Sequence, residues 1–444
     1  MSQSSEPFVA QSRKQWSSEP AFVFSMAAAA VGLGNLWRFP YMVGENGGGA
    51  FVVAYLLALL VVVFPIMVLE VSAGRLSQGN TVQTYRQVNK FGTVYGWFVV
   101  AITTAITSYY LVITGWTLGY AVDAVRGDLR HFDDYSAGYN SLWYFLVVTV
   151  LACLVLIKGI SAIETVSKIL MPVLVLVIIG LVITASQTPG WSDTKAFFFD
   201  VDWSRLSDTR LWAFAFGQAF YTLAIGQGYL VTYGSFIPRK THVPRACMIV
   251  AGTETCIALL AGWMIFPFVF SYGMEPAEGS QLAFVTLPRV FQELTGGAYL
   301  AVIFFGLFFA AAFSSCLAGL KVLIAAVAEE LKVSNTAAVL SVTGLMLVLG
   351  TASALSFTPL NWSIGGDPVL DVIDRVAGGN VIIFSGVVGA ALFCWFIPAQ
   401  RIRSVLGTGN PWWEWRIYLV GRFLPLLILA WLMVTWGVSL IRGG

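Results

Sequence analysis

The sequence predicts an all-α membrane protein whose chain crosses the bilayer many times. Three observations predict this class: the composition, a series of long apolar runs, and two glycine-interrupted runs at matching positions. Of the 444 residues, 58% are hydrophobic and only 11% are charged, whereas an ordinary soluble domain carries about 25% charged residues. So few charges cannot cover the surface of so long a soluble chain. The composition therefore excludes a soluble enzyme, a disordered chain and a nucleic-acid binder.

The apolar runs have the length of transmembrane helices. A hydrocarbon core about 30 Å thick needs about 20 apolar residues per helix. Eleven such runs are present, at residues 20–44, 48–77, 92–124, 141–158, 163–186, 209–237, 242–272, 297–331, 335–354, 368–398 and 411–441. The runs are continuous rather than alternating, which excludes a β-barrel. The sequence therefore predicts eleven transmembrane helices after a polar segment at residues 1–19.

The distribution of charge between the loops predicts the orientation. One set of loops is basic and contains Arg75, Arg86 and Arg245, whereas the other set is acidic and contains Asp133 and Asp193. Cytoplasmic loops carry the excess of Lys and Arg. We therefore expect a multi-pass protein of the cell inner (plasma) membrane with a cytoplasmic N-terminus. Because the number of spans is odd, the C-terminus is expected outside.

Two predicted spans are interrupted in the same way. The first contains Gly32-Leu33-Gly34 and the sixth contains Gly226-Gln227-Gly228. Backbone groups freed at membrane depth must face protein, water or a ligand. One such motif alone is more simply a site of close helix packing. Two interrupted helices at corresponding positions, with Asn35 beside the first, instead favour an inverted-repeat transporter whose site lies between the breaks.

The first span also carries a specific motif, Val31-Gly32-Leu33-Gly34-Asn35-Leu36-Trp37-Arg38-Phe39-Pro40-Tyr41, followed by Glu45-Asn46-Gly47-Gly48-Gly49-Ala50-Phe51. Further matches are Glu70–Arg75, Tyr109-Tyr110, Trp116, Gln218–Gly228, Ala261-Gly262, Ser314-Ser315 and Asp371–Asp374. Together they resemble the neurotransmitter:sodium symporter family, in particular its bacterial amino-acid transporters of the leucine transporter type. That fold usually has twelve helices, and some bacterial members have eleven.

The resemblance implies a fold and an activity. The fold is an inverted five-plus-five repeat, with helices 1–5 at residues 20–186, helices 6–10 at 209–398, a final helix at 411–441, and helices 1 and 6 unwound. The activity is sodium-coupled symport by alternating access. The expected partners are an amino acid, sodium ions and the lipid bilayer, with the oligomeric state open.

The resemblance implies two sodium sites, and a dehydrated Na⁺ suits oxygen ligands. The first site comprises Asn35, Thr222, the Ala30 carbonyl and the carboxylate of the substrate, with Glu254 nearby. The second comprises the carbonyls of Ala28, Val31 and Ala311 and the hydroxyls of Ser314 and Ser315. A ligand shared by ion and substrate couples their binding. For the two serines, hydrogen bonding between helices is the alternative reading.

The resemblance also implies a substrate site. It comprises Ala30, Gly32, Leu33, Gly34, Ile106, Tyr110, Tyr221, Thr222, Ala224, Gln227, Ser315 and Gly319. Bare N–H groups of the broken first helix suit a carboxylate. Monoamine-transporting members have an aspartate where this chain has Gly32, so we expect an amino acid. Because Gln227 and Gly319 replace bulky apolar residues, we expect a larger hydrophobic or aromatic amino acid, unless Gln227 itself fills the space.

Glu254 lies inside the seventh predicted span, where an unpaired charge is costly. Chloride-dependent animal relatives have an asparagine here and bind chloride beside the first sodium ion. A carboxylate supplies that negative charge covalently, so we expect chloride-independent transport, with Glu254 near Tyr55, Gln218 and Thr222. Two other roles stay open: uptake of a proton in the return step, and a neutral acid stabilised by burial and hydrogen bonds.

Charged residues at matching heights predict the gates. By resemblance, Arg38 and Asp374 form the outer pair and Arg13 and Glu329 the inner pair, although the inner two could be ordinary interfacial charges. Glu70, inside the second span, is expected to hydrogen-bond the unwound backbone of helix 6 as structural support.

Other classes of protein fit the sequence less well. A sodium-dependent amino-acid sensor on the same scaffold is the alternative function. A channel needs an open file of sites, whereas these ligand groups converge on one point. The chain has two His and no metal-spaced cluster or nucleophile–base pattern, so we expect no enzyme.

Overall fold

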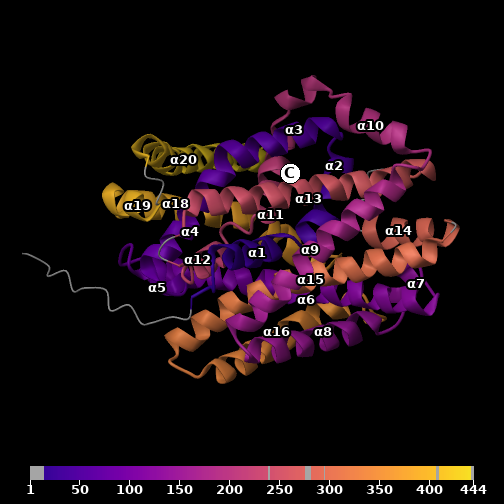
Figure 1. Ribbon diagram of the computed structural model, residues 1–444, viewed down its shortest axis with the longest axis horizontal. Coiled ribbons are helices and arrows are strands. Elements are labelled where there is room, and N and C mark those ends of the chain that lie inside the picture. The colour runs from indigo at the N-terminus through magenta and orange to yellow at the C-terminus, as the bar shows by residue number, and fades with distance from the viewer. Residues whose placement is uncertain (1–14, 239–240, 276–281, 295, 407–409, 442–444) are drawn as a thin grey trace, which may run out of the picture.

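The computed structural model describes residues 15–238, 241–275, 282–294, 296–406 and 410–441, which form a bundle of helices. Most of the long helices lie along the long axis of the molecule (Figure 1). The α-helices of the eleven predicted spans are α1 (Glu19–Ala30), α2 (Phe39–Glu45), α3 (Gly49–Ala58), α4 (Phe64–Ser77), α6 (Gly92–Arg126), α8 (Asn140–Ile157), α9 (Ile160–Ala185), α11 (Thr209–Thr222), α12 (Tyr229–Gly234), α13 (Val243–Ser271), α15 (Gly297–Glu330), α16 (Asn335–Leu355), α17 (Val369–Ile373), α18 (Ile382–Phe396) and α20 (Pro411–Ile441).

The other elements lie between these helices. They are α5 (Thr81–Arg86), α7 (Phe132–Ser136), α10 (Trp191–Phe199), the 3₁₀-helix η3 (Trp203–Ser207), α14 (Leu282–Glu293), α19 (Ala399–Leu406), and an antiparallel pair of two-residue strands, β1 (Ser363–Ile364) and β2 (Asp367–Pro368). Three stretches are π-helical: η1 (Gly34–Arg38), η2 (Leu59–Val63) and η5 (Asp374–Val381). A proline follows η1 and η2 within two residues, at Pro40 and Pro65. Proline has no N–H to continue the α-helical ladder, which favours a local change of winding.

Each of the eleven predicted spans coincides with one helix or one broken set of helices. Within the described residues, eight helical spans are long and apolar enough to cross a membrane, and the pair Glu19–Ala30 and Gly34–Glu45, bent by 47°, makes a ninth. The predicted span 209–237 consists of two shorter pieces, α11 and α12. The last predicted span coincides with α20. The fold is therefore all-α and multi-pass, with helices 1 and 6 interrupted.

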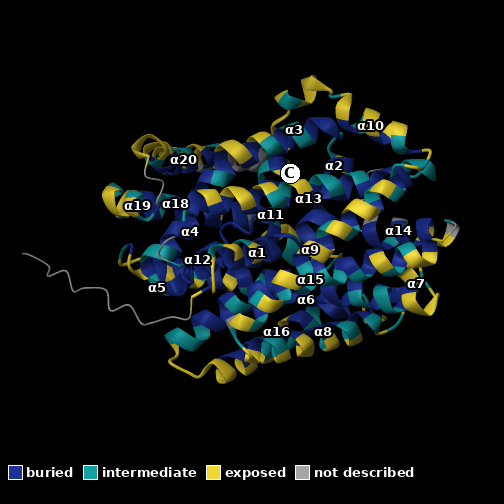
Figure 2. Cartoon of the chain, viewed as in Figure 1, coloured by how far each residue is buried: buried dark blue, intermediate teal, exposed yellow. Residues whose placement is uncertain are grey.

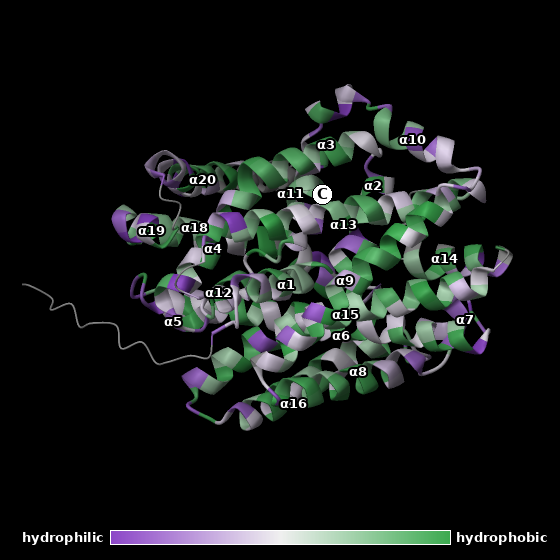
Figure 3. Ribbon diagram, viewed as in Figure 1, coloured by the Kyte–Doolittle hydropathy of each residue, from purple (hydrophilic) through white to green (hydrophobic). Residues whose placement is uncertain are grey.

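Burial separates the central helices from the periphery. Figure 2 shows α1 and α12 almost wholly buried and α8 and α16 exposed along their outer side. The outer side is apolar, as Figure 3 shows for α8 and α16, and Leu176 and Val348 are 70% and 72% exposed. Such apolar exposure is expected of a surface that faces lipid.

The two ends of the bundle carry different loops. Helices α5 and α19 lie at one end, and α7, α10 and α14 lie at the opposite end (Figure 1). The first end contains Arg86 and Arg401, and the second contains Asp133 and Asp193. The structure thus collects basic loops at one end and acidic loops at the other.

Candidate functional site

The first break separates α1 from η1 at residues 31–33. Val31 is extended, with φ −77° and ψ 111°, so the helix cannot continue through it. Two freed N–H groups find side-chain acceptors: Gly32 N–H donates to Asn35 Oδ1 at 3.2 Å and Leu33 N–H donates to Tyr110 Oη at 2.8 Å. Buried N–H groups without acceptors are costly. Asn35 and Tyr110 therefore stabilise the unwound backbone at the depth where the sequence places the site.

The second break separates α11 from α12 at residues 223–228. Its backbone turns through left-handed conformations at Ala224 (φ 52°), Gly226 (φ 75°) and Gly228 (φ 73°). Gly226 N–H donates to Glu70 Oε1 at 3.0 Å, so the contact that the sequence predicted for Glu70 is present. The carbonyl of Gly226 accepts from Ser385 Oγ at 2.7 Å. The unwound turn is thus fixed by side chains from α4 and α18.

Glu254 lies between the two breaks. It is fully buried on α13 and accepts a 2.6 Å hydrogen bond from Asn35 Nδ2 and another from the Thr222 hydroxyl. Tyr55 Oη lies 3.4 Å from its second oxygen. Within the described part of the chain, no Lys or Arg forms an ion pair with Glu254. A buried carboxylate without a cation needs a proton or a bound cation, which fits the expected neighbourhood of a sodium ion.

A second group of oxygen atoms lies where α15 passes the end of α1. Ser314 Oγ donates to the carbonyls of Ala28 and Ala311, each at 2.8 Å. Ser315 Oγ donates to the carbonyls of Ala29 at 3.0 Å and Val31 at 3.2 Å. All five residues expected at the second sodium site therefore meet, and Ala29 joins them. These hydroxyl and carbonyl oxygens are ligands of the kind that Na⁺ accepts.

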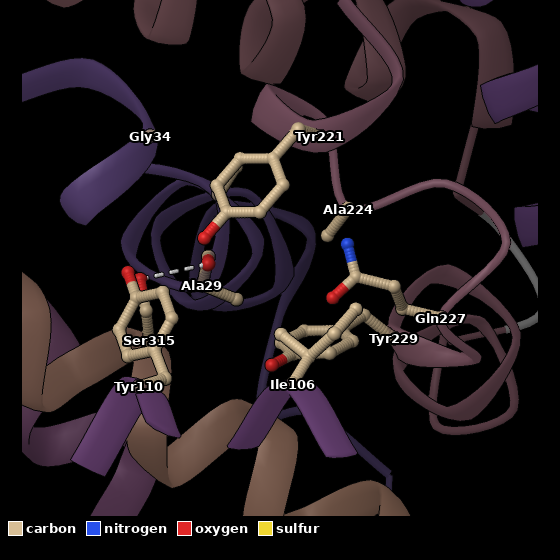
Figure 4. Close-up of a pocket in the computed structure, with 10 residues that line it drawn as sticks. Ala29, Gly34, Ile106, Tyr110, Tyr221, Ala224, Gln227, Tyr229 and Ser315 are labelled. Atoms are coloured by element: carbon tan, nitrogen blue, oxygen red, sulfur yellow. Dashed lines mark hydrogen bonds between the residues drawn. The ribbon is translucent and has the colours of Figure 1, made fainter. Parts of the chain in front are cut away.

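A cavity lies between the two breaks (Figure 4). It is lined by Ala29, Ala30, Gly34, Ile106, Tyr110, Tyr221, Ala224, Gln227, Tyr229 and Ser315. The cavity offers about 20 Å³ to the centres of water molecules. One water molecule needs about 10–15 Å³ of such space, so the cavity has room for little more than one water. An amino acid can therefore occupy the cavity only if lining side chains move.

The prediction that Gly319 enlarges this cavity is wrong. A Cβ at Gly319 would lie 2.4 Å from Tyr229 Oη and 2.7 Å from Thr107 Oγ1, so these two side chains already use the space that glycine leaves. Tyr229 lines the cavity, whereas Gly319 does not. Leu33 was also expected as a side-chain contact and does not line the cavity; its N–H bonds Tyr110. Gly32 and Thr222 are also absent from the lining. The other predicted substrate-site residues do line the cavity: Ala30, Gly34, Ile106, Tyr110, Tyr221, Ala224, Gln227 and Ser315.

The outer pair of charges is not in direct contact. Arg38 lies over the ring of Tyr221, 4.5 Å from its centroid, and its Nη1 lies 3.4 Å from Gln218 Oε1. Asp374 instead accepts a 2.6 Å hydrogen bond from Tyr109 Oη, which lies 3.3 Å from Tyr221 Oη. Tyr221 and Tyr109 therefore link the two residues expected as the outer gate pair, and their gating role stays a prediction. Gln218 also donates to the Gly34 carbonyl at 2.9 Å.

At the inner end, Arg13 lies outside the described residues. Glu329 accepts from Asn80 Nδ2 at 3.0 Å, while the adjacent Glu330 forms an ion pair with Arg86. Trp16 is buried and its Nε1 donates to the Tyr233 carbonyl at 3.2 Å. The described residue Trp16 is thus packed against α12.

Several residues of the site and its two ends were not predicted from the sequence. Tyr229 follows Gly228 directly, and an aromatic residue beside a predicted break is a signal that could have found it. Tyr109 lies in the matched Tyr109-Tyr110 pair, although its link to Asp374 depends on how η5 is placed. The ion pair between Arg86 and Glu330 could have been expected, because Arg86 lies in a basic loop and Glu330 is an acid.

Comparisons with known proteins identify the family. The model of the sodium:neurotransmitter symporter family matches residues 13–141 and 136–437. An uncharacterized sodium-dependent transporter of Haemophilus influenzae is 33% identical, over 94% of this chain and 97% of the relative. The sodium-dependent transporter YhdH of Bacillus subtilis is 31% identical, over 94% and 96%. The bovine sodium-dependent dopamine transporter is 24% identical, over 97% of this chain and 70% of the relative.

A solved structure is also similar. The crystal structure of MhsT in complex with L-phenylalanine aligns with a TM-score of 0.88 and 33% identity, covering 94% of this chain and 98% of that chain. A family match over nearly the whole chain and full-length relatives lead to one conclusion. The chain belongs to the sodium:neurotransmitter symporter family and is a sodium-dependent membrane transporter rather than an enzyme.

Proposed function

We propose that this transporter carries a large hydrophobic or aromatic L-amino acid into the cell together with sodium, by alternating access and without chloride. The observation that carries the proposal is the position of Glu254. This buried carboxylate contacts Asn35 at the first break and Thr222 at the start of the second. The same cavity is lined by Ala30 and Gly34, which flank the first break, and by Gln227 within the second. An ion at Glu254 and a substrate in the cavity would therefore bind next to each other, and each would support the binding of the other.

Two sodium ions are proposed. The first would bind near Asn35, Thr222 and Glu254 with the carbonyl of Ala30, and the second near Ser314 and Ser315 with the carbonyls of α1. The charge of Glu254 would take the role of chloride beside the first ion. Inward movement of two positive charges is favoured by about 2.3 kcal/mol each per 100 mV of membrane potential. The proposed stoichiometry therefore supports accumulation of substrate.

The fit of an amino acid, rather than an amine, rests on Gly32. A Cβ at this position would lie 2.3 Å from both Ser315 Oγ and Tyr110 Oη, so an aspartate side chain would have to displace both hydroxyls. With glycine here, the proposed substrate brings its own carboxylate. The aromatic rings of Tyr110, Tyr221 and Tyr229 around the cavity suit a planar side chain. MhsT, which shares the fold, binds L-phenylalanine in its solved complex.

The proposed direction and topology follow from the charged ends of the bundle. The end with α5 and α19 would face the cytoplasm of the cell inner membrane, with the N-terminus, and the C-terminus would lie outside. Residues 20–186 and 209–398 would form the two inverted repeats, with the helix at 411–441 outside them. Arg38 and Asp374, through Tyr221 and Tyr109, would close the outer path. Asn80 and Glu329, with Arg86 and Glu330, would close the inner path.

Uptake into proteoliposomes tests the proposal. Purified protein is reconstituted, and accumulation of labelled phenylalanine, tyrosine, tryptophan and leucine is measured with an inward Na⁺ gradient and with K⁺ in its place. Accumulation only with Na⁺, unchanged when gluconate replaces chloride, is the expected result. Na⁺-dependent binding without uptake would instead indicate a sensor. Strict dependence on chloride would contradict the role given to Glu254.

A further inference from the structure

We propose that the amide of Gln227 hydrogen-bonds the substrate's side chain, and that this side chain therefore carries a hydrogen-bonding group. The class of substrate is then an aromatic amino acid with a polar ring atom, L-tyrosine or L-tryptophan, in preference to L-phenylalanine or L-leucine. The inference rests on the proposed amino-acid transport and narrows it.

The observation behind it is a buried amide that faces the cavity. Gln227 is only 3% exposed, and Figure 4 shows its amide inside the ring of lining side chains. Among the residues that the structure describes, neither amide atom has a hydrogen-bond partner, although the backbone carbonyl accepts from Thr103 Oγ1 at 2.6 Å. Buried side-chain amides are normally paired. An unpaired one directed into a binding cavity indicates that the ligand provides the partner.

The backbone around Gln227 is fixed, so the amide cannot easily turn elsewhere. Thr103 anchors its carbonyl. On either side, Gly226 and Gly228 have left-handed φ values, and a Cβ on them would lie 2.5 Å from Gly386 N and 2.7 Å from Thr81 Oγ1. These close approaches hold the turn against α18 and α5. Only rotation about the side-chain bonds of Gln227 remains, and the amide stays within the cavity's reach.

The other walls of the cavity are mainly aromatic or apolar. Ile106 and Ala224 supply apolar surface, and the rings of Tyr110, Tyr221 and Tyr229 surround the space. Tyr229 fits because its hydroxyl lies in the notch above Gly319. A flat ring suits such walls, and the amide of Gln227 adds a donor and an acceptor. A phenol hydroxyl or an indole N–H can pair with that amide, whereas a phenyl or isobutyl group cannot.

The unpaired amide of Gln227 should make the site discriminate between substrates with and without a hydrogen-bonding group. A site built to hydrogen-bond a substrate group rejects an analogue without that group, because its own polar atoms are left buried and unpaired. The cost of one such atom corresponds to about 10- to 100-fold in affinity. We therefore expect tyrosine or tryptophan to bind at least about 10-fold more tightly than phenylalanine.

The experiment uses two matched ligand pairs. The full-length protein in saturating Na⁺ is titrated with L-tyrosine and L-phenylalanine, which differ by one hydroxyl, and with L-tryptophan and its benzothiophene analogue, which lacks the indole N–H. The same four ligands are tested on Gln227→Leu, which keeps the side-chain volume and removes the amide. Gln87→Leu, at an exposed glutamine at the inner end, is the matched control. Gln227→Met is the second variant, for use if Gln227→Leu does not fold.

The expected result is a preference of about 10-fold or more for at least one polar ligand over its matched analogue, reduced to within about 3-fold by Gln227→Leu and kept by Gln87→Leu. Equal affinities in the unchanged protein overturn the inference, and so does a preference that survives loss of the amide. If Gln227 only fills space, Gln227→Ala will strengthen the binding of all large side chains and leave both ratios unchanged, which also overturns it. Failure of every amino acid to bind in Na⁺ would remove the proposed function itself.

Discussion

Different groups contact the unwound backbone at the two broken helices. At the first break the backbone carbonyls of α1 point at the hydroxyls of Ser314 and Ser315, and Asn35 contacts the carboxylate of Glu254. At the second break the backbone groups of Gly226 are taken by Glu70 and Ser385, and a side-chain amide is left facing the cavity.

This difference suggests that the two breaks have different functions. The first break presents many oxygen atoms and one buried negative charge, which is the chemistry of a cation site. The second break satisfies its own backbone and presents side chains, which is the chemistry of substrate selection. Each of the following changes should therefore affect one property more than the other.

The largest effect is expected for Glu254→Gln. The change removes the buried charge and keeps the shape, so Na⁺ affinity in chloride-free medium should fall by at least about 100-fold. Added chloride should restore part of it, because an anion can then replace the carboxylate. The measurement is Na⁺-dependent amino-acid binding in gluconate and in chloride. Unchanged Na⁺ affinity in gluconate would exclude Glu254 from the ion site.

Gly226→Ala should act on the second break. A Cβ there would lie 2.5 Å from Gly386 N, and the φ of 75° disfavours alanine. We expect uptake to fall by about 10-fold or more and the protein to unfold at lower temperature, since strain and overpacking together cost about 2–5 kcal/mol. Gly252→Ala is the control, because nothing lies within 4 Å of a Cβ at that position of α13. Equal behaviour of the two variants would show that the second turn is not tightly held.

Ser314→Ala should act on the first break with a moderate effect. Loss of one hydroxyl ligand is expected to weaken Na⁺ binding by about 5-fold and to leave the ratio of tyrosine to phenylalanine affinity unchanged. Ser341→Ala, at an exposed position of α16, is the control. A changed amino-acid preference with normal Na⁺ affinity would reverse the assignment of the two breaks.

The smallest effect is expected for Glu70→Gln. The amide oxygen can still accept from Gly226 N–H, so uptake should stay within about 3-fold of the unchanged protein. Glu70→Ala removes the acceptor and should reduce uptake much further. Both are compared in the same proteoliposome assay. A large loss with Glu70→Gln would mean that the charge of Glu70, and not only its oxygen, takes part in the cycle.

Much of this arrangement could be predicted from the sequence, because particular residues imply particular costs. Glycines inside two apolar runs predicted the two breaks, and an acid inside a third predicted a buried carboxylate that needs partners. Long-range placement was harder to predict. The sequence showed that Gly319 lacks a side chain, but it could not show that Tyr229, from the second break, fills the space. Likewise, the matching heights of Arg38 and Asp374 could not reveal two intervening tyrosines.

The ion and the amino acid are proposed to bind in contact with each other where the two breaks meet. The most direct test is the linkage between them, measured as amino-acid affinity across a range of Na⁺ concentrations and as Na⁺ affinity with and without tyrosine. We expect each ligand to strengthen the binding of the other by the same factor, about 10-fold or more. Equal amino-acid affinity in Na⁺ and in K⁺ would contradict it.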